Sequence, residues 1–283
     1  MNQAIALVTD SAAGLPAELI ERYAIHLVHF WLEVGGRSYP GEALTPDEFF
    51  DLLRHQPPGT LSTGVPSIET FTRLYRRLAE QAEAILSIHL TERNSATCNV
   101  ARLAAERVPV PVHVINTRTT AMGEGFVVLE AARSIARGLP LDEVVARARR
   151  VAEEAGALAL LPDIAYAVRG GRVASAARLL GGLLRIHALV AIEDDRLVIA
   201  GQARSRKAAL KRIVEKLRRR WGDRPVRLAV HYATDRDESA GLLERLQSAL
   251  NCVESHLLRI PPPLGVHAGP DAIGIAYAPV LPD

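Results

Sequence analysis

The first half of the chain alternates short apolar runs with segments of helical periodicity, and this alternation limits the possible folds more than any other feature. The apolar runs at residues 4–8, 84–88 and 112–115 are typical of strands buried on both faces. Polar loops and helical segments follow these runs, and Ser67 has the residue type of an N-cap for one such helix. Strands that alternate with helices predict an α/β fold, whose N-terminal sheet is mostly parallel and carries helices on both faces.

The second half has a looser pattern, which predicts a smaller C-terminal α/β domain with a mixed sheet. A charged helical segment at residues 142–155 is followed by Gly156, a residue type suited to a helix C-terminus. We place the domain boundary there, so that residues 1–156 form an N-terminal parallel α/β domain and residues 157–283 the C-terminal one. The pair Asp194-Asp195 between two strand candidates predicts a hairpin turn. The strand candidates after the boundary are residues 157–161, 188–192, 197–200, 226–232 and 273–278.

Length and composition are those of a globular protein with two domains. The chain has 283 residues, of which 48% are hydrophobic, and this is enough for sizeable cores. A formal net charge of +2 lacks the strong positive excess of a nucleic-acid-binding domain. Two cysteines are too few for a secreted disulfide scaffold, and the N-terminus does not have the pattern of a signal peptide. The apolar run around residues 179–192 is broken by glycines and charges and cannot span a bilayer. We therefore expect a cytoplasmic protein.

Four loops of the first half are rich in hydroxyl groups. One begins with Asp10 and Ser11 directly after the first strand candidate, and the others are residues 61–67, 91–97 and 116–125. Each loop alone is equally well explained as a capped turn. We expect all four at the same end of the parallel sheet, which is where open α/β sheets bind ligands. Because hydroxyl groups and helix N-terminal amides donate hydrogen bonds to carboxylates and phosphates, the four loops together predict a site for an acidic ligand.

Three further stretches of the second half are candidates for the same site. Residues 169–172 (Arg-Gly-Gly-Arg) are either a plain turn or a ligand contact. His267 lies within a predicted loop, the proline- and glycine-rich residues 261–270, whose restricted backbone suits a ligand wall. Residues 204–220 hold nine basic residues against one acid and predict an amphipathic helix with a solvated basic face. The basic residues just before this helix, Arg204 among them, could instead contact an anionic ligand or an acidic partner.

The motifs of several enzyme classes are missing from the sequence. There is no G-x-S-x-G nucleophile motif and no G-x-x-x-x-G-K-[ST] phosphate loop. Gly123-Glu124-Gly125 lacks the third glycine of a dinucleotide-binding motif. His26 and His29 form a close pair without an acidic or cysteine partner for zinc. The sequence therefore predicts a binding site without catalytic residues and without a metal.

Seven segments, in order along the chain, resemble the motifs of the DegV family of bacterial fatty-acid-binding proteins. They are residues 9–16 (T-D-S…L-P in the family), 63–67 (T-S-Q-P-S), 91–97 (S-S-x-L-S-G-T), 116–125 (D-S-x-x-x-S-x-G-x-G), 169–172 (K-G-G-R), 203–207 (K-x-R-x-x-K) and 267–274 (H-T-G-P-G-A-x-G). Any one segment is weak evidence, whereas seven in the same order over nearly the whole chain are specific.

The resemblance implies an apolar tunnel between two α/β domains that takes a long-chain fatty acid. It implies that Thr63, Ser95 and His267 bind the carboxylate. It also implies that this chain is not an enzyme on its own and needs no cofactor. A separate ATP-dependent kinase subunit would phosphorylate the bound acid, which this chain presents, with at most transient membrane contact and no nucleic acid. Accessory contacts to ligand or partner would come from Ser11, Thr97, Arg172 and Arg204.

The sequence departs from the family motifs at positions that bear on the ligand. Glu92 and Asp271 add negative charge close to the expected carboxylate. These acids leave open an enzyme or sensor that acts on a small phosphorylated or carboxylated metabolite in the same crevice. A third interpretation is a regulatory module whose basic segment docks an acidic protein. The neutral departures are Val65 for Gln, Asn94 for Leu and Asn116 for Asp.

Overall fold

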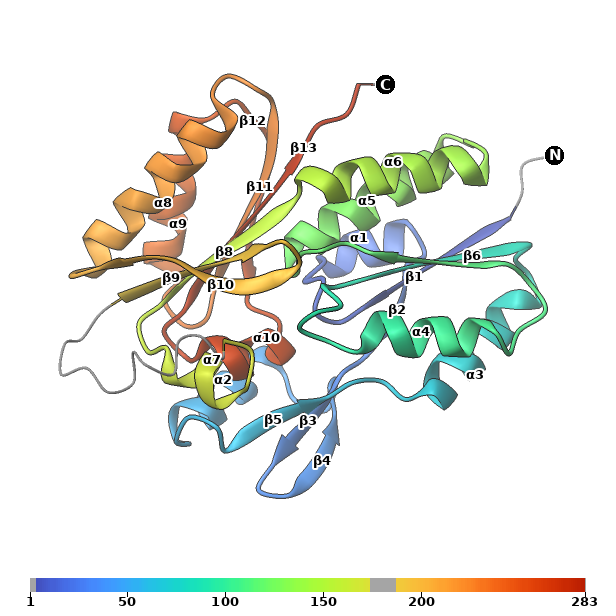
Figure 1. Cartoon of the computed structure of the whole chain (residues 1–283), viewed down its shortest axis with the longest axis horizontal. Helices are drawn as coiled ribbons and strands as arrows, with labels where there is room; N and C mark the ends of the chain where they lie inside the picture. Colours follow the sequence, from blue (N-terminus) through green and yellow to red (C-terminus); the bar gives the residue numbers. More distant parts are fainter. Residues whose placement is uncertain (1–3, 174–186, 283) are drawn as a thin grey trace.

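A computed structural model of the chain describes residues 4–173 and 187–282 (Figure 1). The strands are β1 (Ile5–Asp10), β2 (His26–Val28), β3 (Trp31–Val34), β4 (Arg37–Pro40), β5 (Leu61–Gly64), β6 (Ala84–His89), β7 (Val112–Asn116), β8 (Gly156–Leu161), β9 (His187–Glu193), β10 (Arg196–Ala203), β11 (Val226–Tyr232), β12 (Cys252–Arg259) and β13 (Ile273–Pro279). The helices are α1 (Ala17–Arg22), α2 (Pro46–Arg54), α3 (Ile68–Ala79), α4 (Thr97–Ala105), α5 (Met122–Ala136), α6 (Leu141–Glu154), α7 (Ala165–Arg169), α8 (Arg206–Trp221), α9 (Arg236–Ala249) and α10 (Pro262–Ala268). None of these helices is long and apolar enough to cross a membrane.

The N-terminal sheet has the strand order β2-β1-β6-β7, and all of its pairings are parallel. Helices α3 and α4 cover one face of this sheet, and α5 covers the other (Figure 1). Both faces are buried, which explains the continuous apolar runs of β1 and β6. The Ser67 side chain accepts a hydrogen bond from the Thr70 amide at the start of α3. The parallel sheet, its two helical layers and the Ser67 cap confirm the predictions from the sequence.

The second sheet is mixed, as the sequence predicts, and has the order β10-β9-β8-β13-β11-β12. Helices α8 and α9 pack on one of its faces, while α5 and α6 pack on strand β13. Helix α5 therefore lies between the two sheets (Figure 1). All strands of the first sheet precede residue 117 and all strands of the second begin at Gly156 or later. Because α5 and α6 bind the sheets together, the division at residue 156 stays a prediction.

A third, three-stranded antiparallel sheet with the order β4-β3-β5 was not expected from the sequence. It packs with α2, α7 and α10 around a separate apolar cluster that includes Phe49 and Phe50. Its strands are only four residues long, too short for a clear periodic pattern. This sheet corrects one expectation: three of the four hydroxyl-rich loops follow parallel strands, but residues 61–67 begin as β5, which is antiparallel.

Two local predictions were wrong. Gly156 does not cap α6, because Ala155 already turns the chain into an extended conformation and Gly156 opens β8. Glycine is required there by packing, since a Cβ would lie 2.5 Å from the Tyr277 hydroxyl. Residues 261–270 are not a plain loop, because Pro262 occupies the first turn of α10. His267 lies in the last turn of that helix.

Candidate ligand-binding site

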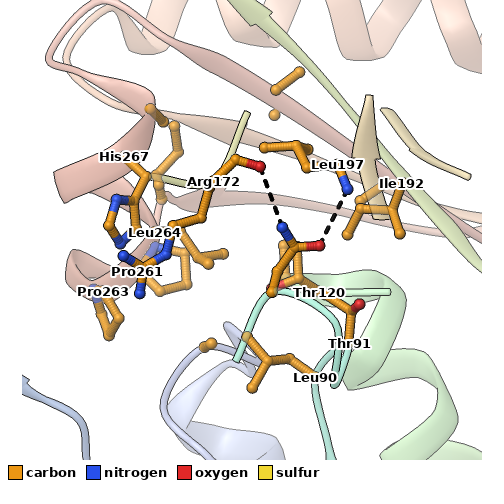
Figure 2. Close-up of a pocket in the computed structure, with 18 of the residues that line it drawn as sticks. Leu90, Thr91, Thr120, Arg172, Ile192, Leu197, Pro261, Pro263, Leu264 and His267 are labelled. Carbon is orange, nitrogen blue, oxygen red and sulfur yellow. Dashed lines mark hydrogen bonds between the residues drawn. The ribbon is translucent and has the colours of Figure 1, made fainter. Parts of the chain in front are cut away.

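The main apolar pocket of the described residues lies between the ends of the parallel strands and one face of the mixed sheet. Loops after β1, β6 and β7 form one side, and α10 closes another (Figure 2). Its cavity volume is about 150 Å³, below the roughly 300–1,000 Å³ of typical small-molecule sites, and part of the pocket faces solvent. The walls are mainly aliphatic, so the pocket suits an apolar molecule. Among the wall residues are Ala157, Ala159, Leu161, Val190, Ile192, Leu197 and Ile275.

The polar residues that line this pocket include Thr63, Ser95, Arg172 and His267, which we call the polar end. Thr91, Asn94, Thr120 and His231 also belong to the lining. Thr63 Oγ1 and His267 Nε2 are 3.3 Å apart and share a hydrogen bond. Ser95 Oγ lies 2.8 Å from Thr97 Oγ1. The sequence motifs that named Thr63, Ser95 and His267 are far apart in the chain, and the fold brings all three to one pocket.

His267 is held against a glycine and is electrically neutral. A Cβ on Gly170 would lie 2.3 Å from His267 Nδ1, so residue 170 must be glycine for the ring to sit there. Burial, and then the charge of Arg172, lowers the pKa of His267 to about 3. His267 Nδ1 is buried and has no hydrogen-bond partner among the described residues. An imidazole in this state can donate or accept one further hydrogen bond.

Arg172 supplies the positive charge of the polar end. Its guanidinium donates to the Gly170 carbonyl at 2.6 Å, and Figure 2 shows the side chain running beside His267. Burial lowers the pKa of Arg172, although an arginine remains charged. Across residues 4–173 and 187–282, no carboxylate forms an ion pair with it. A half-buried guanidinium of this kind favours a bound anion.

Three of the accessory residues lie outside the pocket lining. Ser11 Oγ accepts from the Phe30 amide, and Thr97 is fully buried at the first turn of α4, so both hold loops in place. Arg204 is exposed between β10 and α8. The acids that raised the question of an altered ligand also point elsewhere. Glu92 pairs with Arg102 at 2.8 Å, and Asp271 is exposed.

A buried polar network lies beneath the loops that form the pocket floor. His89 Nδ1 donates to Asp10 Oδ2 at 2.8 Å, and His89 Nε2 lies 2.7 Å from Ser87 Oγ. The Tyr75 hydroxyl donates to Ser87 at 2.7 Å, so the proton of Ser87 is free to bond His89. Asp10 Oδ1 also accepts from the Ala12 amide, which lies in the pocket wall. We call Tyr75, Ser87, His89, Asp10 and Glu124 the floor network.

Glu124 completes the floor network as a neutral carboxyl group. Burial, and then the negative charge of Asp10, raises its pKa well above the ordinary value. Thr9 donates to Glu124 Oε1 at 3.2 Å. As an ionised group, Glu124 has no hydrogen-bond partner for Oε2 among the described residues. Asp10, His89 and Glu124 each offer an atom within 4.8 Å of the others, a spacing that could hold a metal ion. A proton on Glu124 that is donated to Asp10 satisfies the oxygen atoms of both carboxyl groups without a metal ion.

Sequence reasoning missed His231, which lies in the wall of the pocket. It is buried in the mostly apolar strand β11, where a polar residue gives no signal of the direction in which its side chain points. Its Nε2 accepts from the Met122 amide and its Nδ1 donates to the Arg259 carbonyl. Burial lowers the pKa of His231 to about 4 and keeps the ring neutral. Both ring nitrogens are occupied, so His231 offers the pocket only its carbon edge.

Comparison with known proteins identifies the family. The model described as "Uncharacterised protein, DegV family" matches residues 4–280. The chain belongs to the DegV family. A DegV domain-containing protein of Streptomyces coelicolor is 33% identical over 281 residues, which cover 98% of this chain and 99% of that protein. The family resemblance of the seven sequence motifs is thereby confirmed.

Solved structures of DegV proteins have the same fold. A structure described as "Fatty Acid Binding of a DegV family Protein from Thermus thermophilus" superposes with a TM-score of 0.91 at 31% identity, covering 98% of this chain and 100% of that one. DegV of Bacillus subtilis, described as a fatty acid binding protein, gives a TM-score of 0.87 at 27% identity, with coverage of 98% and 100%. The α/β architecture predicted from the sequence is that of these DegV proteins.

Proposed function

We propose that this DegV protein binds a long-chain fatty acid, with the acyl chain in the apolar pocket and the carboxylate at the polar end. The observation that carries the proposal is that a mainly aliphatic pocket holds an arginine, which has no acidic partner among the described residues, beside a neutral histidine and a threonine. The Thermus and Bacillus proteins, described as fatty acid binding, support it.

The apolar walls supply most of the affinity. Burying about twelve methylene groups at about 0.8 kcal/mol each is worth roughly 10 kcal/mol. Association and the freezing of chain rotations oppose this by several kcal/mol. Micromolar binding requires about −8 kcal/mol, so the hydrogen bonds of the polar end have to add to what the apolar walls leave. A small polar metabolite would leave the aliphatic walls unfilled, so the pocket favours the fatty acid over that alternative.

The polar end selects and orients the carboxylate. Arg172 keeps the acid ionised, since a charge-assisted hydrogen bond favours the charged form. Thr63 and Ser95 contribute hydroxyl donors, and His267 contributes whichever ring nitrogen carries its single proton. Four groups from different parts of the chain thus fix one oxygen-rich head group.

The proposed role in the cell is to present this carboxylate to an ATP-dependent kinase that forms an acyl phosphate. Phosphoryl transfer needs an ionised, oriented nucleophile, while ATP and magnesium can be held by another protein. Arg204, exposed beyond the pocket, is a candidate contact for that partner. Such a protein would work in the cytoplasm and would not be an enzyme on its own.

Native mass spectrometry of gently purified protein tests the binding proposal. The expected result is a bound fatty acid of roughly 14 to 18 carbons, the chain range that the family resemblance implies, with most of its surface buried. A protein that carries no lipid and binds neither palmitate nor oleate would contradict the proposal. Adding the kinase from the same organism and ATP should then yield an acyl phosphate. Binding without phosphorylation would refute only the presenting role.

A further inference from the structure

The β9–β10 hairpin forms a wall of the pocket, and polar side chains attach its tip to the opposite side. Ile192 and Leu197 of this hairpin line the pocket. Strand β10 is the edge of the mixed sheet, so only one of its sides is paired in the sheet. The turn of the hairpin reaches the loops that follow β6 and β7, in the centre of Figure 1.

Asp195 makes the first of these attachments. It lies in the turn and is only 7% exposed. Thr91 Oγ1 donates to Asp195 Oδ1 at 2.6 Å, and Asn116 Nδ2 donates to Asp195 Oδ2 at 3.1 Å. Asp194 and Asp195 both have positive φ, 49° and 66°, as a two-residue hairpin turn requires. The turn therefore fixes the direction in which the carboxylate points.

Asn94 makes the second attachment, at the edge strand itself. Its Oδ1 accepts from the Leu197 amide at 3.1 Å, and its Nδ2 donates to the Arg172 carbonyl at 3.3 Å. The two dashed bonds in Figure 2 are these contacts. Asn94, in the loop after β6, thus joins the hairpin to the backbone of Arg172 at the polar end.

The residue types on the two sides are complementary. The buried Asp195 carboxylate has no cationic partner among the described residues, and only neutral donors hold it. An amide at position 116 can donate to it. A carboxylate at that position would place two negative charges about 3 Å apart, which is strongly unfavourable away from water.

We propose that Asp195, Thr91, Asn116 and Asn94 form a clasp, and that the hairpin it holds is the movable wall through which the acyl chain enters and leaves. This inference rests on the proposed function. A cavity of about 150 Å³ is too small for a long acyl chain unless some wall moves. The hairpin packs on an apolar cluster through Val190, Leu197 and Ile199. It nevertheless has one free edge in the sheet, and its tip is held by side-chain hydrogen bonds that water can replace.

The substitutions Asn116→Asp and Asp195→Asn test the clasp singly and together. At pH 8, Asn116→Asp places a second carboxylate directly beside that of Asp195. The double variant Asn116→Asp/Asp195→Asn restores one amide and one carboxylate in exchanged positions. Asn99→Asp, on the exposed side of α4, is the matched control for an added charge. Stopped-flow fluorescence with cis-parinaric acid, a fluorescent 18-carbon fatty acid, gives the association and dissociation rates.

Opening of the wall should speed both directions of exchange. We expect Asn116→Asp to raise both rates by about tenfold, the factor that a hydrogen bond to a charged group is commonly worth, with the equilibrium affinity little changed. The double variant should return both rates toward those of the natural protein, and Asn99→Asp should leave them unaltered. The rate of amide hydrogen exchange at residues 190–199 should rise in Asn116→Asp, but not in the double variant or in Asn99→Asp.

Three results would overturn the inference. Unchanged rates in Asn116→Asp would show that the clasp does not limit exchange. A faster dissociation with weaker affinity and no faster association would make the hairpin a fixed wall. If the double variant exchanged fatty acid as fast as Asn116→Asp, the loss of the Asn116–Asp195 contact would not be the cause of the faster exchange. If the natural protein binds no cis-parinaric acid, the fatty-acid proposal fails with it. The hydrogen-exchange comparison then still distinguishes a hairpin held by the clasp from one that is not.

Discussion

The polar end of the pocket and the floor network beneath it use similar residues in opposite ways. Both contain a histidine beside hydroxyl groups. In the floor network, His89 is bonded through both ring nitrogens, to Asp10 and to Ser87. At the polar end, His267 Nδ1 has no partner among the described residues, and Arg172 has no carboxylate.

The difference separates polar groups that hold the fold from polar groups that await a ligand. A buried polar group that finds its partner within the chain costs little and fixes the surrounding loops. One without a partner costs free energy in the empty protein and regains it when a complementary group binds. The four predictions below test this distinction, from the largest expected effect to the smallest.

Breaking the floor network should cost the most stability. In Asp10→Ala, His89 and Glu124 lose a shared partner in a fully buried position. We expect the free energy of unfolding to fall by about 3–5 kcal/mol, because the buried His89 Nδ1–H and the Ala12 amide lose their acceptor, at roughly 1–3 kcal/mol for each group left unsatisfied. Urea unfolding followed by circular dichroism measures this. Asp10→Asn, which keeps the shape, should cost less, and equal losses in the two variants would contradict the assignment.

Removing the charge of the polar end should weaken binding without destabilising the protein. In Arg172→Met the aliphatic stem is kept and the guanidinium is lost. We expect the affinity for a fatty acid to fall about 10- to 100-fold, the equivalent of about 1.5–3 kcal/mol for a charged hydrogen bond. Equilibrium binding of radiolabelled fatty acid measures this loss. The matching fatty alcohol is the control, and an equal loss of alcohol affinity would mean that Arg172 does not contact the carboxylate.

The neutral state of Glu124 should make stability depend on pH. Its folded pKa is raised well above the ordinary 4.5, so its contribution is complete below pH 4.5 and is lost as pH rises toward the folded pKa. The loss should approach about 1.4 kcal/mol per pH unit. Glu124→Gln lacks this dependence, so unfolding measured from pH 5 to 8 should increasingly favour the variant. A difference between the two proteins that stays constant with pH would refute the neutral carboxyl group.

The smallest effect is expected at Thr63. Thr63→Val keeps the shape and removes the hydroxyl that bonds His267. The affinity for a fatty acid should fall about fivefold, since a neutral hydrogen bond is worth about 1 kcal/mol. The same binding measurement, with Ser62→Val on the exposed neighbouring residue as control, checks this. A loss as large as that of Arg172→Met would show that Thr63 carries more than one hydrogen bond.

Much of the fold could be predicted from the sequence, because buried strands leave a local signal. The runs that became β1, β6, β7 and β11 are mostly apolar, and the pair Asp194-Asp195 forms the predicted turn. Strand β12 was missed because its side chains are nearly all half-buried and give neither a continuous apolar run nor a clean alternation. The small sheet was missed because its strands are short.

The candidate site was predicted in part. Thr63, Ser95, Arg172 and His267 all line the pocket, which sequence motifs could indicate because loops carry their residues in recognisable order. Ser11, Thr97 and Arg204 lie outside the lining, since the position of a hydroxyl in a loop does not reveal the direction of its side chain. Whether these residues contact a ligand or a partner stays a prediction.

By itself, the sequence determined an α/β chain of the DegV family with hydroxyl-rich loops, because burial periodicity and motif order are local properties. Only the tertiary structure decided which polar side chains of those loops have partners within the chain. Asp10 and His89, Thr63 and His267, and Asn116 and Asp195 are each separated by at least 79 residues. A hydrogen bond depends on distance in space, and the pairing of strands and the packing of helices set those distances.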